Sequence, residues 1–203
     1  MSENPESGRE RRSTIERNTK ETQIQIEIAL DGTGSYDIDT GVAFFDHMLE
    51  SFSRHSLFDL TVKAKGDLDV DTHHTIEDVG IVLGQAFREA LGSASGIRRY
   101  GQTTLPMAES KVEVAVDVSN RPFLLYQVEL VNDRIGSFDA TLTEDFLQAL
   151  TQNAGLDLHV ELRYGRNPHH VVEAVFKGLA RALRVAVELD PKQSGLPTVK
   201  GAL

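Results

Sequence analysis

The chain has 203 residues, of which 40% are hydrophobic, enough to bury a core as one domain or as two small fused halves. Lys and Arg number 21 against 31 Asp and Glu, and the formal net charge of −10 argues against nonspecific nucleic-acid binding. The absence of cysteine excludes a disulfide framework, a thiolate nucleophile and a Cys-based zinc site. Any metal must therefore be bound by histidines and carboxylates.

The start of the chain is polar, and we expect residues 1–14 to form a disordered tail. It lacks the apolar core of a signal peptide, and no later stretch is apolar for long enough to span a bilayer. These features predict a cytoplasmic protein with no membrane partner.

The first half, residues 15–105, predicts the order strand, strand, helix, strand, helix. The periodicity of polar and apolar residues places these elements at 22–30, 35–39, 43–54, 57–65 and 73–91. Turn residues at 31–34 predict that the first two strands form a hairpin. Asp71 is placed to cap the second helix.

The second half, residues 106–190, predicts the same order. Its elements are expected at 111–119, 122–131, 141–153, 156–164 and 169–188, and a tail follows at 191–203. Two matches support an internal repeat: DLTV at 59–62 with DLHV at 157–160, and DTHHTIEDV at 71–79 with NPHHVVEAV at 167–175. We therefore predict an α+β fold of two β-β-α-β-α halves, each a small sheet backed by two helices.

The repeat carries a His-His-x-x-Glu motif at the start of the last helix of each half. The two copies are His73, His74 and Glu77, and His169, His170 and Glu173. At 3.6 residues per turn, the first His and the Glu share a face, whereas the second His is rotated by about 100°. Two such helices related by a pseudo-twofold axis could build two equivalent sites, each with the second His of the other copy. Imidazole and carboxylate suit Mn, Fe, Zn or Ni, so the donors leave the metal open.

A fourth ligand is expected from the preceding helix of each half. His47 lies 26 residues before His73, and Asp145 lies 24 residues before His169. The distance from the matched strand segment to the motif also differs by two residues between the halves. Asp145 therefore corresponds to His47. His159 stands where the first copy has Thr61, and we assign it to packing or hydrogen bonding.

From residue 17 to residue 201 the chain resembles imidazoleglycerol-phosphate dehydratases. The segments that carry the resemblance are FFDHML (44–49), DTHHTIEDVG (71–80), GIRRYG (96–101), DVSNRPF (117–123) and NPHHVVEAVFKGLARAL (167–183). The resemblance implies a duplicated α+β domain of the ribosomal protein S5 domain 2-like type, assembled into a shell of 24 subunits. It implies two Mn²⁺ ions per active site at subunit interfaces. The implied reaction is the dehydration of imidazoleglycerol phosphate to imidazoleacetol phosphate in histidine biosynthesis.

The resemblance also implies roles for individual residues. One manganese ion would take His47, His74, His169 and Glu173, and the other His73, Glu77, Asp145 and His170. Glu21 matches a substrate-contacting carboxylate and is the candidate catalytic acid and base. The phosphate-side contacts would be Arg99, Arg121, Lys177 and Lys200. The chain departs from the family pattern at Asp145, commonly His or Glu, and at Val199, commonly Ser or Thr.

Two other functions fit the motifs. A dinuclear metallohydrolase would act on phosphate esters or amides without an imidazole, because His and carboxylate sites also activate water. A metal-bridged structural shell would assemble with metal and show no turnover. An RNA-binding module of similar layout is disfavoured by the acidity and by the absence of a basic stripe.

Overall fold

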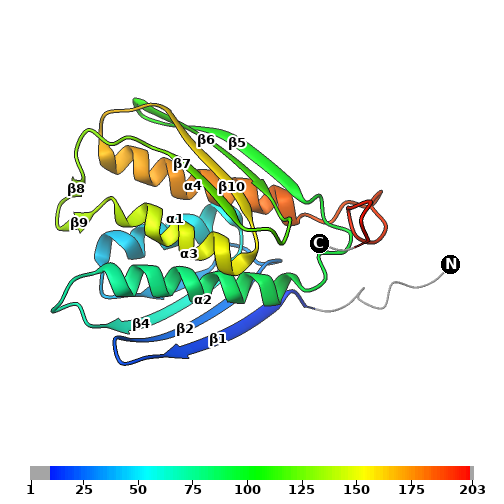
Figure 1. Cartoon of the computed structure of the whole chain (residues 1–203), viewed down its shortest axis with the longest axis horizontal. Coiled ribbons are helices and arrows are strands. Elements are labelled where there is room, and N and C mark those ends of the chain that lie inside the picture. The colour runs from blue at the N-terminus through cyan, green and yellow to red at the C-terminus, as the bar shows by residue number, and fades with distance from the viewer. Residues whose placement is uncertain (1–9, 202–203) are drawn as a thin grey trace.

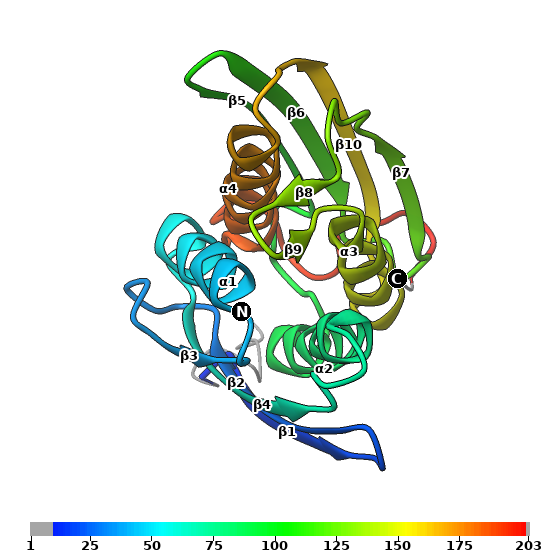
Figure 2. The same cartoon turned by 90° about the vertical axis from the view of Figure 1, so that its left-hand side faces the viewer.

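The computed structural model describes residues 10–201 of the chain. Its elements, in chain order, are β1 (Arg12–Asn18), β2 (Thr22–Ala29), β3 (Tyr36–Asp39), α1 (Ala43–Ser56), β4 (Asp59–Gly66), α2 (His73–Leu91), β5 (Tyr100–Met107), β6 (Ser110–Asp117), β7 (Phe123–Gln127), β8 (Arg134–Ile135), β9 (Phe138–Asp139), α3 (Leu142–Ala154), β10 (Asp157–Tyr164) and α4 (Pro168–Val187). The helices of this part of the chain lie between two four-stranded sheets (Figures 1 and 2). The predicted α+β fold of two halves, each with a small sheet and two helices, is confirmed. Within residues 10–201, no helix is long and apolar enough to cross a membrane.

The two sheets have the same topology. Their strand orders are β1-β2-β4-β3 and β5-β6-β10-β7, and in each the last pair is parallel while the other two are antiparallel. The second strand of each sheet follows from the alternation of apolar and polar residues. Ile24, Ile26 and Ile28 of β2 are buried, as are the valines at 112, 114 and 116 of β6. The repeat is therefore confirmed, with one strand more in each four-stranded sheet than the sequence predicted, and β8 pairs with β9 as a separate two-stranded sheet in the second half.

The missed strands of the two four-stranded sheets are β1 and β5, and they correct two predicted boundaries. Residues 12–14 belong to β1 and not to a disordered tail, because Ser13 and Ile15 face the core while the polar residues that alternate with them are exposed. Residues 1–9 of the predicted tail lie outside the described residues. The predicted boundary between residues 105 and 106 falls inside β5, which pairs with β6 along its whole length and begins the second sheet.

The hairpin predicted between residues 22–30 and 35–39 is not formed. Strand β4 lies between β2 and β3, and β3 pairs with β4 in parallel. The intervening loop folds onto the start of β4, where Asp59 Oδ1 accepts hydrogen bonds from the backbone N–H groups of Thr33 at 2.8 Å and Ser35 at 2.9 Å. The strand predicted at 122–131 also ends earlier, at Gln127.

The helices pair across the two halves. Figure 2 shows α1 beside α4 and α2 beside α3, with one helix of each pair from each half. Gly80 and Gly84 allow α3 to approach α2 closely, because a Cβ at either position would lie 2.7 Å from a backbone oxygen of α3. Phe176 and Ala180 stand at the corresponding positions of α4. This exchange of partners brings residues of both halves together at the starts of the helices.

Candidate active site

A side-chain oxygen accepts a backbone N–H at the start of both motif helices. The Oδ1 of Asp71 accepts a hydrogen bond from the backbone N–H of His73 at 2.8 Å, although the N-cap position of α2 is Thr72, whose side chain makes no cap hydrogen bond. The Oδ1 of Asn167 accepts the corresponding bond from His169 at 3.0 Å, and Pro168 occupies the first turn. In both halves, the first His of the motif therefore lies in the first turn of its helix.

The N-terminal parts of α1 and α4 bring His47, His169 and Glu173 together. One ligand atom from each lies within 4.8 Å of the others, and no further group of this kind occurs among residues 10–201. The Nε2 of His169 lies 3.3 Å from Oε2 of Glu173, whose other oxygen pairs with Lys177 at 2.7 Å. Burial raises the pKa of Glu173, but the hydrogen bond and charge of Lys177, then the charges of His47 and His169, outweigh it and hold the pKa below its usual value. The cluster therefore offers an ionised carboxylate and two imidazoles.

A second group of potential ligands lies where α2 meets α3. The Nε2 of His73 lies 3.9 Å from Glu77, and its Nδ1 lies 3.8 Å from Asp145. The two carboxylates thus face opposite nitrogens of one ring, and the three side chains are about half exposed. They converge less than the first group, and binding one ion would require the ring or a carboxylate to turn.

The second His of each motif faces a different carboxylate. The Nδ1 of His74 lies 3.0 Å from Asp67, and the Nδ1 of His170 lies 2.6 Å from Glu109. The hydrogen bond to Asp67 raises the pKa of His74; burial opposes the rise, and nearby acidic groups including Glu21 add to it. The pKa of Glu109 is lowered to about 2, first by the backbone N–H of Asn167 and then by the ring of His170.

The expected joining of α2 and α4 motifs within one chain is therefore not found in the described part of the molecule. Helix α2 packs on α3, and α4 packs on α1, so His74 and His170 do not reach the opposite cluster. The reason is the pairing of helices, which sequence periodicity does not specify.

Glu21 lies in the turn between β1 and β2, next to the start of α2. Buried Asp78 anchors this turn, since it pairs with the guanidinium of Arg17 and accepts a hydrogen bond from the Thr22 hydroxyl at 2.5 Å. Glu21 itself is exposed, and it is close enough to His74 for its charge to contribute to the pKa shift of that ring. The candidate acid and base is thus held beside the first His-His-x-x-Glu motif.

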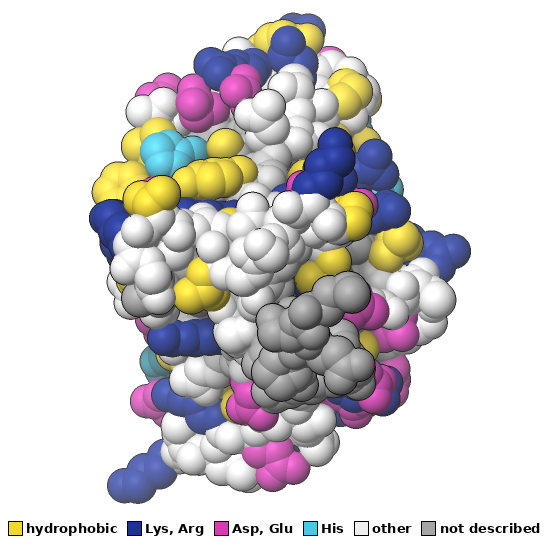
Figure 3. Space-filling view, turned by 90° about the vertical axis from the view of Figure 1, so that its right-hand side faces the viewer, with side chains coloured by type: hydrophobic (Ala, Val, Ile, Leu, Met, Phe, Trp, Pro, Cys, Tyr) yellow, Lys and Arg dark blue, Asp and Glu magenta, His cyan; other side chains and the backbone are white. Residues whose placement is uncertain are grey.

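Three of the four predicted phosphate contacts meet in a pocket of about 720 Å³. Arg99, Arg121 and Lys200 line it, together with residues not singled out from the sequence, Arg98, Ser119 and Thr198. Figure 3 shows Lys and Arg side chains gathered on this end of the molecule, where the C-terminal segment lies. Lys177 is not in the pocket and contacts Glu173 instead.

Arg99 ties the wall of this pocket to the C-terminal segment. Its guanidinium donates to Asp117 at 2.6 Å and 2.9 Å and to the carbonyl oxygen of Pro197 at 2.9 Å. Val199 lines the pocket and is fully exposed, but the hydroxyls of Ser119 and Thr198 also line it. The pocket therefore retains hydroxyl groups despite the valine.

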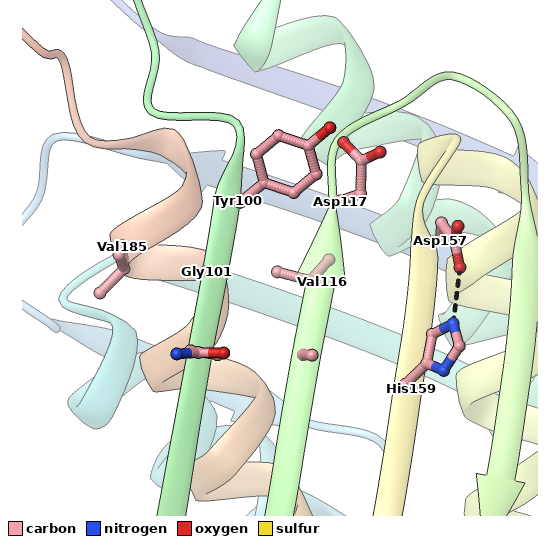
Figure 4. A pocket seen from close by; sticks show the side chains of 9 residues that line it. Tyr100, Gly101, Val116, Asp117, Asp157, His159 and Val185 are labelled. Atoms are coloured by element: carbon pink, nitrogen blue, oxygen red, sulfur yellow. Dashed lines mark hydrogen bonds and ion pairs between the residues drawn. The ribbon is translucent and has the colours of Figure 1, made fainter.

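His159 lies on the outer face of the second sheet. Its Nε2 is 3.1 Å from Oδ1 of Asp157, in a hollow of about 550 Å³ that also includes Tyr100 and Asp117 (Figure 4). The hydrogen-bonding role assigned from the sequence is confirmed.

The sequence model of the imidazoleglycerol-phosphate dehydratase family matches residues 40–183. The chain belongs to this family. The dehydratase of Geobacter sulfurreducens is 54% identical over 95% of this chain and 99% of its own, and that of Paracoccus denitrificans is 55% identical over 95% and 100%. The crystal structure of the Staphylococcus aureus dehydratase has a TM-score of 0.81 at 38% identity, covering 88% of this chain and 99% of its own. The structure from Pyrococcus furiosus, in complex with (S)-C348, has a TM-score of 0.81 at 36% identity, covering 93% and 100%.

Membership of the imidazoleglycerol-phosphate dehydratase family makes the chain a hydro-lyase of histidine biosynthesis. Sequence reasoning identified the histidines and carboxylates of both clusters. It missed Asp67 and Glu109, since a carboxylate that holds a histidine has no spacing signal of its own. The pair Arg98-Arg99 in the GIRRYG segment was the available signal for Arg98.

Proposed function

We propose that the chain dehydrates imidazoleglycerol phosphate to imidazoleacetol phosphate at a dinuclear manganese site shared between copies of the chain. The observation that carries this proposal is the convergence of His47, His169 and Glu173 within 4.8 Å. The donor set fits a divalent metal, because imidazole and carboxylate suit Mn²⁺ and its neighbours. When bound, the ions would act as Lewis acids toward the imidazole of the substrate.

The two ligand sets are proposed to need a second copy of the chain. The first cluster would be completed by His74 and the second by His170, both supplied by a neighbouring copy. This is supported by the partial exposure of these rings, which in their own chain contact Asp67 and Glu109. A homo-oligomer, with 24 subunits as in the expected shell, is part of the proposal.

Glu21 is the proposed catalytic acid and base. Dehydration removes one C–H proton and the neighbouring hydroxyl, and the resulting enol becomes the ketone after a proton returns to carbon. A carboxylate beside the site can accept the first proton and deliver a proton again. The fixed position of its turn supports this role, because the hydroxyl of Thr22, next to Glu21, donates a hydrogen bond to Asp78 of α2.

The substrate phosphate is proposed to bind the basic pocket. Arg121 and Lys200 are free of ion pairs within residues 10–201, whereas Arg99 is engaged with Asp117 and offers fewer donors. Lys177 stands next to Glu173 and would contact the substrate from the metal side. We also propose a cytoplasmic location, in keeping with the lack of cysteine.

The test is release of a ketone from imidazoleglycerol phosphate by the full-length protein after chelation and after reloading with Mn²⁺. We expect turnover only in the reloaded sample. His169→Gln should lose metal and turnover, whereas the matched variant His159→Gln should keep both. Full activity without metal would contradict the dinuclear site.

The alternatives give different results in the same samples. Hydrolysis of phenyl phosphate without turnover of imidazoleglycerol phosphate would favour a metallohydrolase. Metal-dependent assembly without turnover of either compound would favour a structural shell.

A further inference from the structure

The second His of each motif is held by a carboxylate through the same ring nitrogen. The Nδ1 of His74 lies 3.0 Å and 3.2 Å from the two oxygens of Asp67, and the Nδ1 of His170 lies 2.6 Å from Oε2 of Glu109. The Nε2 of each ring has no hydrogen bond to another described residue. Both rings are partly exposed, and both leave the same nitrogen without a partner among the described residues.

The two carboxylates come from different places in the repeat. Asp67 follows β4, whereas Glu109 lies in the turn between β5 and β6. The strand registers show that Glu109 corresponds to Glu21, because Ile24 pairs with Ala64 just as Val112 pairs with Leu162. The second His of each motif thus contacts a carboxylate in both halves, but this carboxylate comes from a different element in each half.

This difference divides the carboxylates of the two halves between two tasks. In the second half, Glu109 itself contacts His170, and residues 163–165 at the end of β10 contain no acidic residue in the place of Asp67. In the first half, Asp67 contacts His74, and Glu21 is exposed with a carboxylate that accepts no hydrogen bond from a described residue.

We propose that Asp67 and Glu109 are positioning residues that hold the Nδ1–H of His74 and His170, so that Nε2 is free to bind a metal in a neighbouring copy. An ionised carboxylate only accepts hydrogen bonds, so each ring must donate from Nδ1, and the neutral ring then carries its lone pair on Nε2. Carboxylates that hold metal-binding histidines fix the orientation and the tautomer of the ring. The proposal rests on the proposed metal function.

The test is Mn²⁺ affinity of the assembled full-length protein, measured by competition with a chelator. Asp67→Leu should weaken one Mn²⁺ site by about 10- to 100-fold. Asp67→Asn should restore most of the affinity, because the side chain has no other hydrogen bond to a described residue and its amide oxygen can turn to accept from Nδ1–H. Asp37→Asn, which changes a carboxylate paired with Lys63, is the matched control.

Glu109→Gln should behave in the opposite way to Asp67→Asn. The Oε1 of Glu109 accepts from the backbone N–H groups of Asn167 at 2.7 Å and Arg166 at 3.2 Å, so the amide oxygen of a glutamine stays there. Its NH₂ group would then face His170 and donate to Nδ1, which moves the ring proton to Nε2 and blocks the ligand atom. We expect a loss of about 10- to 100-fold at the other Mn²⁺ site. Glu113→Gln, which changes a carboxylate paired with Arg163, is the matched control.

The outcomes separate the two proposals. If the unmodified protein binds no Mn²⁺, the metal function itself is wrong. If it binds Mn²⁺ and both Asp67→Leu and Glu109→Gln match their controls, the metal function stands and the positioning roles are overturned. Thermal unfolding of the chelated variants shows whether a variant has lost its fold. If Asp67→Leu has lost its fold, Asp67→Asn provides the test, and a folded Asp67→Asn protein that has lost Mn²⁺ affinity contradicts the proposal.

Discussion

Asp145 of α3 lies 3.8 Å from His73 of α2, so a residue of the second half stands beside the motif of the first. The converse holds at the other end of the repeat, where His47 of α1 lies beside His169 of α4 with ring centroids 6.3 Å apart. Each group of potential ligands is thus built from both halves. A duplicated chain can use this exchange to make two related but unequal sites.

We predict that Asp145→Ala lowers Mn²⁺ occupancy of the site that contains His73. A carboxylate oxygen must come within roughly 2.0 to 2.2 Å of a manganese- or zinc-like ion, and the short side chain of aspartate lies on the far side of the ring from Glu77. Asp145→Glu should retain or improve binding, because it adds one methylene of reach. The measurement is metal stoichiometry under limiting Mn²⁺.

The competing explanation is that Asp145 only stabilises the start of α3, where acidic residues suit the helix dipole. Glu144→Ala is a matched control, since Glu144 lies in the same turn. Equal binding of both ions by Asp145→Ala and Glu144→Ala would remove Asp145 from the site.

The second prediction concerns the contact between α2 and α3. A Cβ at Gly80 would lie 2.7 Å from the backbone oxygen of Phe146 and 2.9 Å from the Cβ of Ala149, so Gly80→Val must push α3 away. Overpacking of this kind costs about 1–3 kcal/mol, and we expect a loss of that size in the free energy of unfolding of the metal-free protein.

Glu89→Val is the control, because it places the same β-branched side chain on an exposed position of the same helix. Gly80→Val should also weaken the Mn²⁺ site next to Asp145, which moves with α3. Equal stability of the two variants would mean that α2 and α3 do not meet closely at this point.

The helices and the two motifs could be predicted from the sequence, because apolar periodicity and the repeat of HHxxE are local signals. Strand β1 was missed since only Ser13, Ile15 and Arg17 of its charged sequence turn toward the protein. The partner of each helix could not be predicted, because it depends on close approaches such as those at Gly80 and Gly84. The pocket around Arg98 and Thr198 depends on where the C-terminal segment folds back, which periodicity does not record.

The third prediction is a loss of stability in acid that depends on Asp59. Burial raises its pKa, but hydrogen bonds from the backbone N–H groups of Ser35, Thr33 and Gly34 outweigh burial and lower the pKa overall. The folded pKa therefore lies below the unfolded value of about 3.9, so the stabilisation is complete above about pH 4 and is lost as the pH falls through the folded pKa.

Asp59→Asn keeps an accepting oxygen but does not titrate. Its free energy of unfolding should therefore fall less below about pH 4 than that of the unmodified protein. Urea unfolding at a series of pH values measures this slope, with Glu89→Gln as an exposed control. Parallel curves for all three proteins would show that Asp59 titrates alike in the folded and unfolded chain.

The last prediction concerns the pair of Arg99 and Asp117, which holds the C-terminal segment in place. Both side chains are largely buried, and Arg99 also donates to the carbonyl oxygen of Pro197 at 2.9 Å. Asp117→Ala leaves the guanidinium without its carboxylate, and breaking a buried pair from one side costs about 3–5 kcal/mol. The unpaired Arg99 should turn toward solvent and release Pro197, so trypsin should cleave after Lys192 several-fold faster.

Glu113→Ala is the control, because it breaks an exposed pair with Arg163 on the same sheet and should leave cleavage unchanged. The affinity for imidazoleglycerol phosphate should fall in Asp117→Ala alone, since Lys200 leaves the pocket with the segment. Cleavage and affinity like those of the control would show that the segment is held by other contacts.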